Sequence, residues 1–330
     1  MKLAAGIPRR HAVVGLGFGV PLSGVFLYLA ARNVEFAQVG ESLAPADAGR
    51  VAAAVALIGV MYVLQAARWR FIARRESDQP VTSFLAYVVG GLTCNNLVPG
   101  RVGDLLRVHW LARGAGIPRT RAFGTVVVDR SSDLLALVAL LLLTLPITPH
   151  PAWLGRIHVV ATAGGVVLLA LLVAARHHAR GGDRSARSRL GAKVSDGLTT
   201  MASAVNRRDA PVVAAYSFAA WAAWCASAWL VASSLGITLT LPQILFAAAV
   251  INLGVAIPSS PGFVGTYQWL CVSTLGLLAV DRVDAFAFSV LFHAVWYVPT
   301  TLAGLALAVA RGPAGLSSLR VRPAVVRSSG

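Results

Sequence analysis

Long apolar stretches divide this chain of 330 residues and predict helices that cross a membrane. A helix needs about 20 apolar residues to span a bilayer. Six stretches approach or exceed that length: residues 12–31, 51–67, 122–145, 157–175, 211–235 and 285–310. The first follows Lys2, Arg9 and Arg10, as the apolar part of a signal peptide would, but no clear cleavage site precedes Arg32. We therefore expect it to remain as the first transmembrane helix.

Two further apolar regions are interrupted and predict a different structure. Residues 81–98 are apolar, but the stretch 101–121 that follows carries six charged residues. Residues 242–257 are short and lead into a Pro-Ser-Ser-Pro-Gly run, after which 263–280 is apolar again. Each region is either a re-entrant hairpin or a pair of full spans. The charges favour a hairpin for the first region, because a charge facing lipid at a helix centre costs about 2.5–3.5 kcal/mol.

The composition agrees with a membrane protein. Hydrophobic residues make up 57% of the chain and charged residues only 13%, whereas soluble domains have about a quarter. The formal net charge is +16. Membrane proteins collect Lys and Arg in their cytoplasmic loops, which accounts for such an excess. No basic stretch alternates with aromatic residues on a folded domain, so we expect no nucleic-acid partner.

The charges of the loops predict how the chain is oriented in the cell membrane. We expect this to be an inner or plasma membrane. The loop 68–80, with Arg68, Arg70, Arg74 and Arg75, and the loop 176–210 are rich in arginine and should be cytoplasmic, as should both termini. The linkers 32–50 and 146–156 are poor in basic residues and should lie outside. The region 81–121 must then enter and leave from the cytoplasm, and the region 242–280 from outside.

A short motif recurs and predicts an inverted internal repeat. The sequence PGRVG at 99–103 returns as PGFVG at 261–265, an offset of 162 residues. The same offset carries 51–67 onto 213–229 and 122–145 onto 284–307. The predicted units are 1–50 (first helix and external linker), 51–145 (repeat one), 146–210 (span and basic loop), 211–310 (inverted repeat two) and 311–330 (basic tail). The fold class is an all-α polytopic membrane protein, with about six spans plus two opposed re-entrant hairpins, or eight or more spans.

The two hairpin tips are expected to approach each other inside the membrane around a polar cavity. Irregular backbone at membrane depth is tolerated only where protein or a wet cavity satisfies its polar groups. Inverted repeats with broken helices are also a recurring transporter design, with the substrate site near the midplane. The predicted tip residues are Pro99, Gly100, Gly103, Pro258, Pro261, Gly262 and Gly265.

Charged residues inside the predicted membrane region are the main candidates for a binding site. They occur at helical spacing in two groups, namely Arg101, Asp104 and Arg107, and Asp129, Arg130 and Asp133. A guanidinium suits a lipid phosphate, and the aspartates would orient the arginines or respond to protons. The alternative is a pairing network that only pins the hairpin to its neighbouring helix. In either case, a carboxylate should lie within salt-bridge distance of Arg130.

The second copy lacks these charges and offers neutral polar residues. The candidates for contacts with a polar headgroup are Ser259, Ser260, Gln268 and His293, with Asn96 before the first Pro-Gly pair. Packing or a place at the membrane interface is the alternative role for them. No catalytic motif is present, and the three cysteines have no metal-ligand spacing, so we expect no metal and no cofactor.

Three segments together resemble the lysylphosphatidylglycerol synthase transmembrane-region family, also called flippase-like proteins. They are NNLVPGRVGDLLR at 95–107, VDRSSD at 128–133 and IPSSPGFVG at 257–265. The resemblance covers about 50–310 and implies a protein that moves lipids or lipid-linked headgroups between leaflets. The family usually has Glu where this chain has Gln268 and Glu-Arg where it has Asp129-Arg130. The first departure argues against a mechanism that needs a carboxylate in the second repeat.

These observations together predict a lipid translocase for an anionic or polyprenyl-phosphate-linked lipid. In bifunctional members of the family a soluble synthase domain is attached; this chain ends about 20 residues after its last predicted span, so we expect no aminoacyl transfer. One alternative is a non-transporting scaffold subunit of a glycosyltransferase or synthase. A weaker alternative is an integral-membrane transferase with Asp129 or Asp133 as base.

Overall fold

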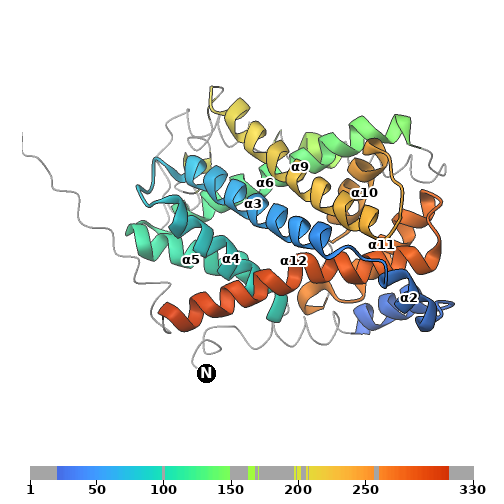
Figure 1. The fold of residues 1–330 in the computed structure, drawn as a ribbon. Helices are drawn as coiled ribbons and strands as arrows, with labels where there is room; N and C mark the ends of the chain where they lie inside the picture. The colour runs from blue at the N-terminus through green and yellow to red at the C-terminus, as the bar shows by residue number, and fades with distance from the viewer. Residues whose placement is uncertain are drawn as a thin grey trace, which may run out of the picture.

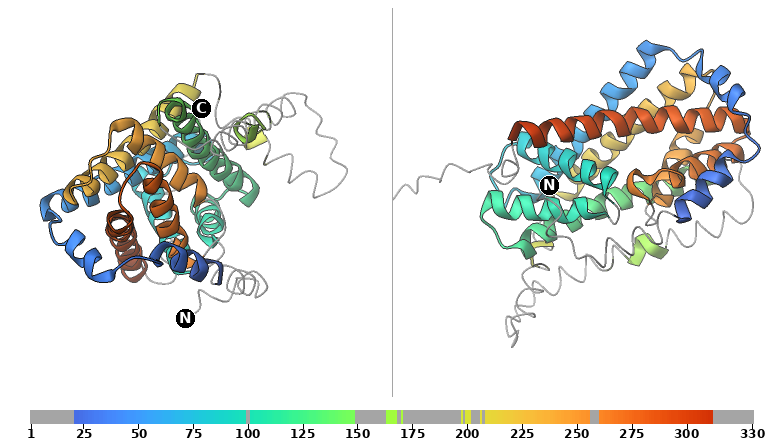
Figure 2. Two further views of the ribbon diagram at one scale, coloured as in Figure 1. Left: turned by 90° about the vertical axis from the view of Figure 1, so that its right-hand side faces the viewer. Right: turned by 90° about the horizontal axis from the view of Figure 1, so that it is seen from below.

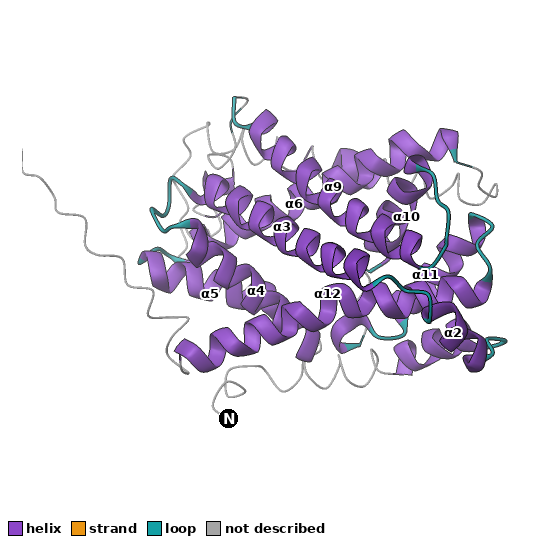
Figure 3. Ribbon diagram, in the orientation of Figure 1, coloured by secondary structure: helices purple, strands orange, loops and turns teal. Residues whose placement is uncertain are grey.

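The computed structural model describes residues 21–98, 101–148, 163–167, 170, 197, 199–201, 206, 208–255 and 260–311. This part of the chain is built from helices and loops without strands (Figure 3). After a first apolar helix at Pro21–Ala31, the helices are α2 (Phe36–Leu43), α3 (Ala48–Ala73), α4 (Val81–Leu97), α5 (Val102–Ala115), α6 (Arg119–Thr144), η2 (Leu145–Ile147), α9 (Ala210–Ser234), α10 (Leu241–Gly254), η3 (Pro261–Phe263), α11 (Thr266–Leu277) and α12 (Arg282–Arg311).

Three of the described helices are long and apolar enough to cross a membrane, namely α3, α9 and α12. Helix α6 has 26 residues, but charged residues interrupt its apolar sequence. Helices α4, α5, α10 and α11 have 17, 14, 14 and 12 residues, fewer than the roughly 20 that a full span needs. The predicted apolar stretches therefore correspond to helices of two lengths.

The long and short helices are arranged around a central pair. Helices α3 and α9 pack side by side along most of their length (Figure 1). The short helices form two packed pairs, α4 with α5 and α10 with α11, which lie at opposite ends of the view in Figure 1. Helix α12 contacts both α4 and α11 and runs the length of the molecule (Figure 2). Helix α12 thus joins the two short-helix pairs, and so does α6, which contacts α5 and α10.

Local sequence signals explain where several helices begin and end. The side chain of Asp47 accepts a hydrogen bond from the Arg50 N–H at 2.6 Å and caps α3. Gly116 ends α5 in the left-handed region, with φ +67°. Thr240 and Gln243 form a capping box at the beginning of α10. Each cap satisfies backbone groups that a helix end leaves unpaired.

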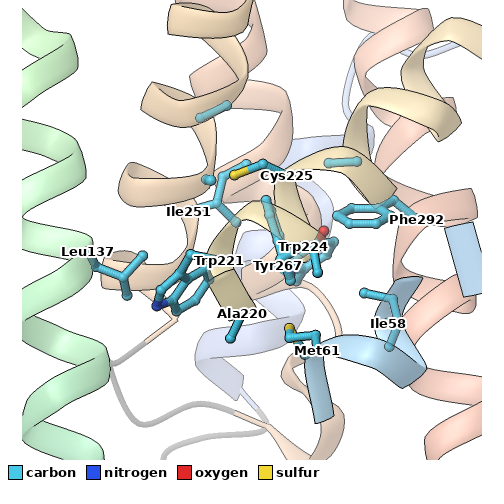
Figure 4. Packing of buried hydrophobic residues seen from close by; sticks show 14 of the residues in the cluster. Ile58, Met61, Leu137, Ala220, Trp221, Trp224, Cys225, Ile251, Tyr267 and Phe292 are labelled. Atoms are coloured by element: carbon cyan, nitrogen blue, oxygen red, sulfur yellow. The ribbon is translucent and has the colours of Figure 1, made fainter. Parts of the chain in front are cut away.

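The apolar core draws on both halves of the chain. Trp221 and Trp224 of α9 lie beside Tyr267 of α11 and Phe292 of α12 (Figure 4). The rings of Trp224 and Phe292 are 5.0 Å apart, edge to face. The α3–α9 contact uses small residues: the Ser227 hydroxyl of α9 donates to the Ala54 carbonyl of α3 at 2.9 Å. Small residues that let helix backbones approach are typical of membrane helix packing.

Two boundaries differ from the sequence prediction. The prediction of a loop at 68–80 is wrong for its first residues. Helix α3 continues to Ala73 and includes both Arg68 and Arg70. Arg68 is fully buried, since it has carboxylate partners inside the protein. The predicted external linker 32–50 contains a helix, α2.

Several predicted features lie outside the described residues. They are the tip residues Pro99, Gly100 and Pro258, the candidate Ser259, most of the stretch 157–175, the beginning of the first stretch and the basic tail after residue 311.

Candidate functional site

Two aspartates on α6 form the centre of a buried ionic cluster. Asp129 and Asp133 lie one turn apart and are 0% and 8% exposed. Arg68 of α3 binds both of them: Nε donates to Asp129 Oδ1 at 2.9 Å and Nη1 to Asp133 Oδ1 at 2.6 Å. Nη1 also donates to the Ser217 hydroxyl of α9 at 2.9 Å. One guanidinium therefore ties α3, α6 and α9 together.

A second buried arginine approaches the same carboxylate from α5. Arg107 is 1% exposed, and its Nη2 donates to Asp129 Oδ2 at 2.7 Å. Its Nη1 lies 3.3 Å from Asp104 Oδ1, one turn earlier on α5. The guanidinium carbon lies 4.2 Å from the ring centre of Trp69, a cation–π contact. The two oxygens of Asp129 are thus shared between two arginines from different helices.

Arg130 differs from these two arginines because it is not buried. Its side chain is 36% exposed, and so is that of Asp104. Its guanidinium nitrogens lie 3.4 Å from Asp104, 3.6 Å from Asp129 and 3.5 Å from Asp133. The predicted pairing of Arg130 with a carboxylate is therefore confirmed. Nη1 donates to Asp133 Oδ2 at 3.5 Å, whereas Nε is buried without a hydrogen-bond partner.

The buried charges of the cluster are paired with one another. Buried charges are tolerated only when they are paired and hydrogen-bonded, and Arg68, Arg107 and Asp129 meet that condition. They form a rigid base under the accessible pair Arg130 and Asp104. A rigid base lowers the cost of orienting an arginine toward a ligand.

Residues next to the two Pro-Gly motifs contact each other. Arg101, which begins α5 in the left-handed region with φ +52°, donates through Nη2 to the Val255 carbonyl. Its guanidinium also lies 5.3 Å from the ring centre of Phe263. Gly103 N donates to Asn95 Oδ1 at 2.8 Å, which ties the beginning of α5 to the end of α4. The residues that follow the first motif thus reach the second one.

Asn96 makes the matching contact from α4. It is 3% exposed, its amide nitrogen donates to the Thr301 hydroxyl at 2.9 Å, and its backbone carbonyl accepts from the Tyr297 hydroxyl at 3.3 Å. A Cβ on Gly262 would lie 3.2 Å from the Asn96 carbonyl. The segment around Gly262 therefore packs directly on the end of α4.

The neutral candidates of the second region are brought together only in part. Gln268 and His293 form a buried pair, with Gln268 Nε2 2.7 Å from His293 Nδ1. Ser260 holds the local backbone, because its N–H donates to the Ser23 hydroxyl at 2.9 Å and its hydroxyl donates to the Val264 carbonyl at 2.8 Å. Gly265 lies against the backbone of Ser23. The first helix thus packs on the second Pro-Gly segment.

The sequence reasoning missed Arg68, Trp69 and Ser217. A signal for Arg68 was present, because it continues the buried face of α3 at helical spacing. That face consists of Ala54, Ile58, Met61, Gln65, Arg68 and Ile72. Trp69 also continues a buried face of α3 at helical spacing, with Tyr62, Ala66 and Ala73. Its contact with Arg107 of α5 was not visible in the sequence.

The long apolar helices and the fold define a helical membrane protein with a buried ionic cluster. The chain belongs to the lysylphosphatidylglycerol synthase transmembrane-region family, whose sequence profile matches residues 13–304.

Two curated relatives are similar to it. Glycosyltransferase AglD of Haloferax volcanii is 28% identical over 342 residues, covering 91% of this chain and 54% of AglD. The UPF0104 membrane protein MJ1078 of Methanocaldococcus jannaschii is 23% identical over 216 residues, covering 64% of this chain and 90% of that protein. The chain spans about half the length of AglD.

Proposed function

We propose that this protein is a lipid translocase that binds the phosphate of a membrane lipid at Arg130 and moves the headgroup between leaflets. The observation that carries the proposal is the contrast between Arg130, which is 36% exposed, and the fully buried arginines and aspartate that support it. An accessible guanidinium on a rigid ionic base suits a phosphate. Arg101 is the second proposed phosphate partner, and Arg107 holds the base in place.

The local charge balance supports an anionic ligand. Four arginines, at 68, 101, 107 and 130, stand against three aspartates, at 104, 129 and 133, which leaves one positive charge in excess. A phosphate would remove that excess. Asp129 lies about 15 Å along α6 from the beginning of the helix, so the site is deep enough to receive a headgroup that has left the membrane surface.

The proposed route uses the two short-helix pairs as opposed re-entrant hairpins of an inverted repeat. The shortness of α4, α5, α10 and α11 supports this arrangement, as do the contacts between Arg101 and Phe263 and between Asn96 and Gly262. The headgroup would pass through a polar cavity between the hairpin tips while its chains stay in the bilayer. Both termini would be cytoplasmic.

A second candidate function is supported by one comparison. The relative AglD is named a glycosyltransferase, and this chain matches about half of it. The chain would then act as a membrane unit that presents or receives a lipid-linked sugar for a glycosyltransferase. This function also needs a site for a lipid phosphate, so Arg130 should bind that phosphate here as well. A scaffold that binds no lipid does not share it.

The test is a reconstituted flipping assay. Purified protein in liposomes would be given fluorescent phosphatidic acid, and the fraction that a membrane-impermeant reductant bleaches would be followed over time. Arg130→Gln should lower the rate by at least about tenfold, because a charge-assisted contact is worth about 1.5–3 kcal/mol. Arg113→Gln is the matched control, since Arg113 is exposed on α5. Equal rates for wild type, Arg130→Gln and empty liposomes would overturn the proposal.

The orientation has its own test. Cysteine at Gly40→Cys should react with an impermeant thiol reagent from outside intact cells, and cysteine at Leu190→Cys should not. Labelling of position 190 from outside would exclude the inverted repeat.

A further inference from the structure

The three aspartates of the ionic cluster are held very differently. The two oxygens of Asp129 have guanidinium partners at 2.9 and 2.7 Å, and Asp133 Oδ1 has one at 2.6 Å. Asp104 makes longer contacts, 3.3 Å to Arg107 and 3.4 Å to Arg130, and its side chain is 36% exposed. Of these three carboxylates, Asp104 is therefore the one that can exchange a proton with its surroundings.

The groups around Asp104 keep it charged in the free protein. The charged neighbours are Arg101, Arg107, Asp129 and Arg130. Helices α4 and α6 pack on α5; α4 has no charged side chain, and its titratable residues, Tyr87 and Cys94, are neutral at physiological pH. Arginines at salt-bridge distance favour the carboxylate form. Asp104 therefore stays charged as long as no other anion occupies Arg130.

A count of charges shows what a bound phosphate would change. The two buried arginines of the cluster are matched by two buried aspartates. The accessible edge of the cluster consists of Arg101, Arg130 and Asp104, two positive charges against one negative, which leaves one positive charge in excess. A phosphodiester with a single charge balances that excess. A phosphate group with about two negative charges overcompensates it unless a proton binds too.

We propose that Asp104 binds a proton when a doubly charged lipid phosphate binds at Arg130, so that lipid and proton occupy the site together. The phosphate replaces Asp104 as the partner of Arg130, because phosphate and guanidinium form strong, parallel hydrogen bonds. The displaced carboxylate then faces an anion, which favours its neutral form. The proton comes from the surrounding water and binds a carboxylate oxygen.

This inference rests on the proposed translocase function and adds a coupling to protons. Coupling between two ligands is reciprocal: if the lipid promotes proton binding, protons promote lipid binding by the same factor. The affinity for a doubly charged lipid should therefore rise as the pH falls. A singly charged lipid balances the accessible edge without a proton, so its affinity should not depend on pH. Joint transfer of lipid and proton would let a pH gradient drive the lipid toward the less acidic side.

The first experiment compares two ligand charges over a range of pH. Detergent-solubilised full-length protein would be titrated with a fluorescent polyprenyl-diphosphate hexose, whose two phosphates carry one charge each, and with fluorescent phosphatidylglycerol, which carries one. Neither ligand titrates near neutral pH, because only a phosphomonoester has a second proton in that range. Wild type should bind the diphosphate lipid at least about tenfold more tightly at about pH 5 than at about pH 8. Its affinity for phosphatidylglycerol should stay within about twofold.

The second experiment removes the proton site. Asp104→Asn imitates the neutral carboxyl group, so it should bind the diphosphate lipid at about pH 8 as tightly as wild type does at about pH 5. Its affinity should not change with pH. His109→Gln is the matched control, because His109 also lies on α5 and titrates in the same range, but contacts Arg119 at 3.4 Å. This variant should keep the wild-type profile.

A direct measurement of protons completes the test. Addition of the diphosphate lipid to wild type in weakly buffered solution with a pH-sensitive dye should show proton uptake, up to one proton per bound lipid. Addition of phosphatidylglycerol, or of either lipid to Asp104→Asn, should show none.

The outcomes separate the two proposals. The same pH profile for wild type and Asp104→Asn, or a profile that disappears in His109→Gln, would overturn the inference. Flipping of the diphosphate lipid with an affinity independent of pH would overturn the proton coupling and leave the translocase standing. Proton-coupled binding without any flipping would leave the proton site standing and overturn only the translocase.

Discussion

The regions that follow the two Pro-Gly motifs place very different side chains at positions that correspond in the predicted repeat. An offset of 162 residues carries Asp129, Arg130 and Asp133 onto Leu291, Phe292 and Val295. The first set is charged, and the second is apolar and packed in the core, with Phe292 fully buried against Trp224.

The difference bears on why the charges are there. Replacing a buried ion pair with well-packed apolar residues is often neutral or stabilising, and the second region shows such apolar packing in this same chain. A helix pair next to a Pro-Gly segment can thus be built without an ionic cluster. This contrast supports the proposed ligand role of the cluster around Asp129.

The largest expected effect comes from breaking the charged region at its centre. Asp129→Asn removes a negative charge that compensates the buried positive charges of Arg68 and Arg107. Removing one partner of a buried ion pair costs about 3–5 kcal/mol of stability. Thermal unfolding in detergent should show this loss as a large fall in midpoint temperature. Phe292→Leu, at a position that corresponds to the neighbouring Arg130, should cost less, about 1–2 kcal/mol. Equal losses would mean that the two regions are held together in the same way.

An intermediate effect is expected where the second motif packs on α4. Gly262 has φ +64°, and a Cβ there would meet the Tyr297 ring and the Asn96 carbonyl. Gly262→Ala should lower stability by about 1–3 kcal/mol. Gly116→Ala is the matched control, because its φ is +67° but no atom lies within 4 Å of an added Cβ; it should cost about 1 kcal/mol. If both variants unfold at the same temperature, the close approach of Gly262 to α4 contributes nothing to the stability of the protein.

The smallest effect on stability is expected at the accessible edge of the charged region. Asp104 is 36% exposed and lies 3.3 Å from Arg107 and 3.4 Å from Arg130. Asp104→Asn should change unfolding by less than about 1 kcal/mol, because half-exposed ion pairs contribute little. It should also bind phosphatidic acid more tightly, by up to about tenfold, since Asp104 competes with a phosphate for Arg130. Weaker binding would show that Asp104 serves the ligand rather than competing with it.

The apolar pattern predicted most of the helices. The stretches 51–67, 122–145, 211–235 and 285–310 correspond to α3, α6, α9 and α12, because hydrophobic runs of that length leave a chain few alternatives in a membrane. The two interrupted regions, 81–121 and 242–280, also fold as pairs of shorter helices. The Pro and Gly residues between the apolar runs predicted these breaks. The end of α3 was missed because an arginine after an apolar run is typical of a membrane boundary, and Arg68 is instead buried.

The sequence by itself determined the class of protein, the family and the list of charged residues available for a site. Composition, span lengths and the segments around 95–107, 128–133 and 257–265 are local properties of the chain. Only the tertiary structure decided how those charges are used. It paired Arg68 and Arg107 with Asp129 and left Arg130 accessible. The reason is physical: helical spacing fixes which residues share a face, but the partner of a buried charge comes from another helix, and that choice is made by packing.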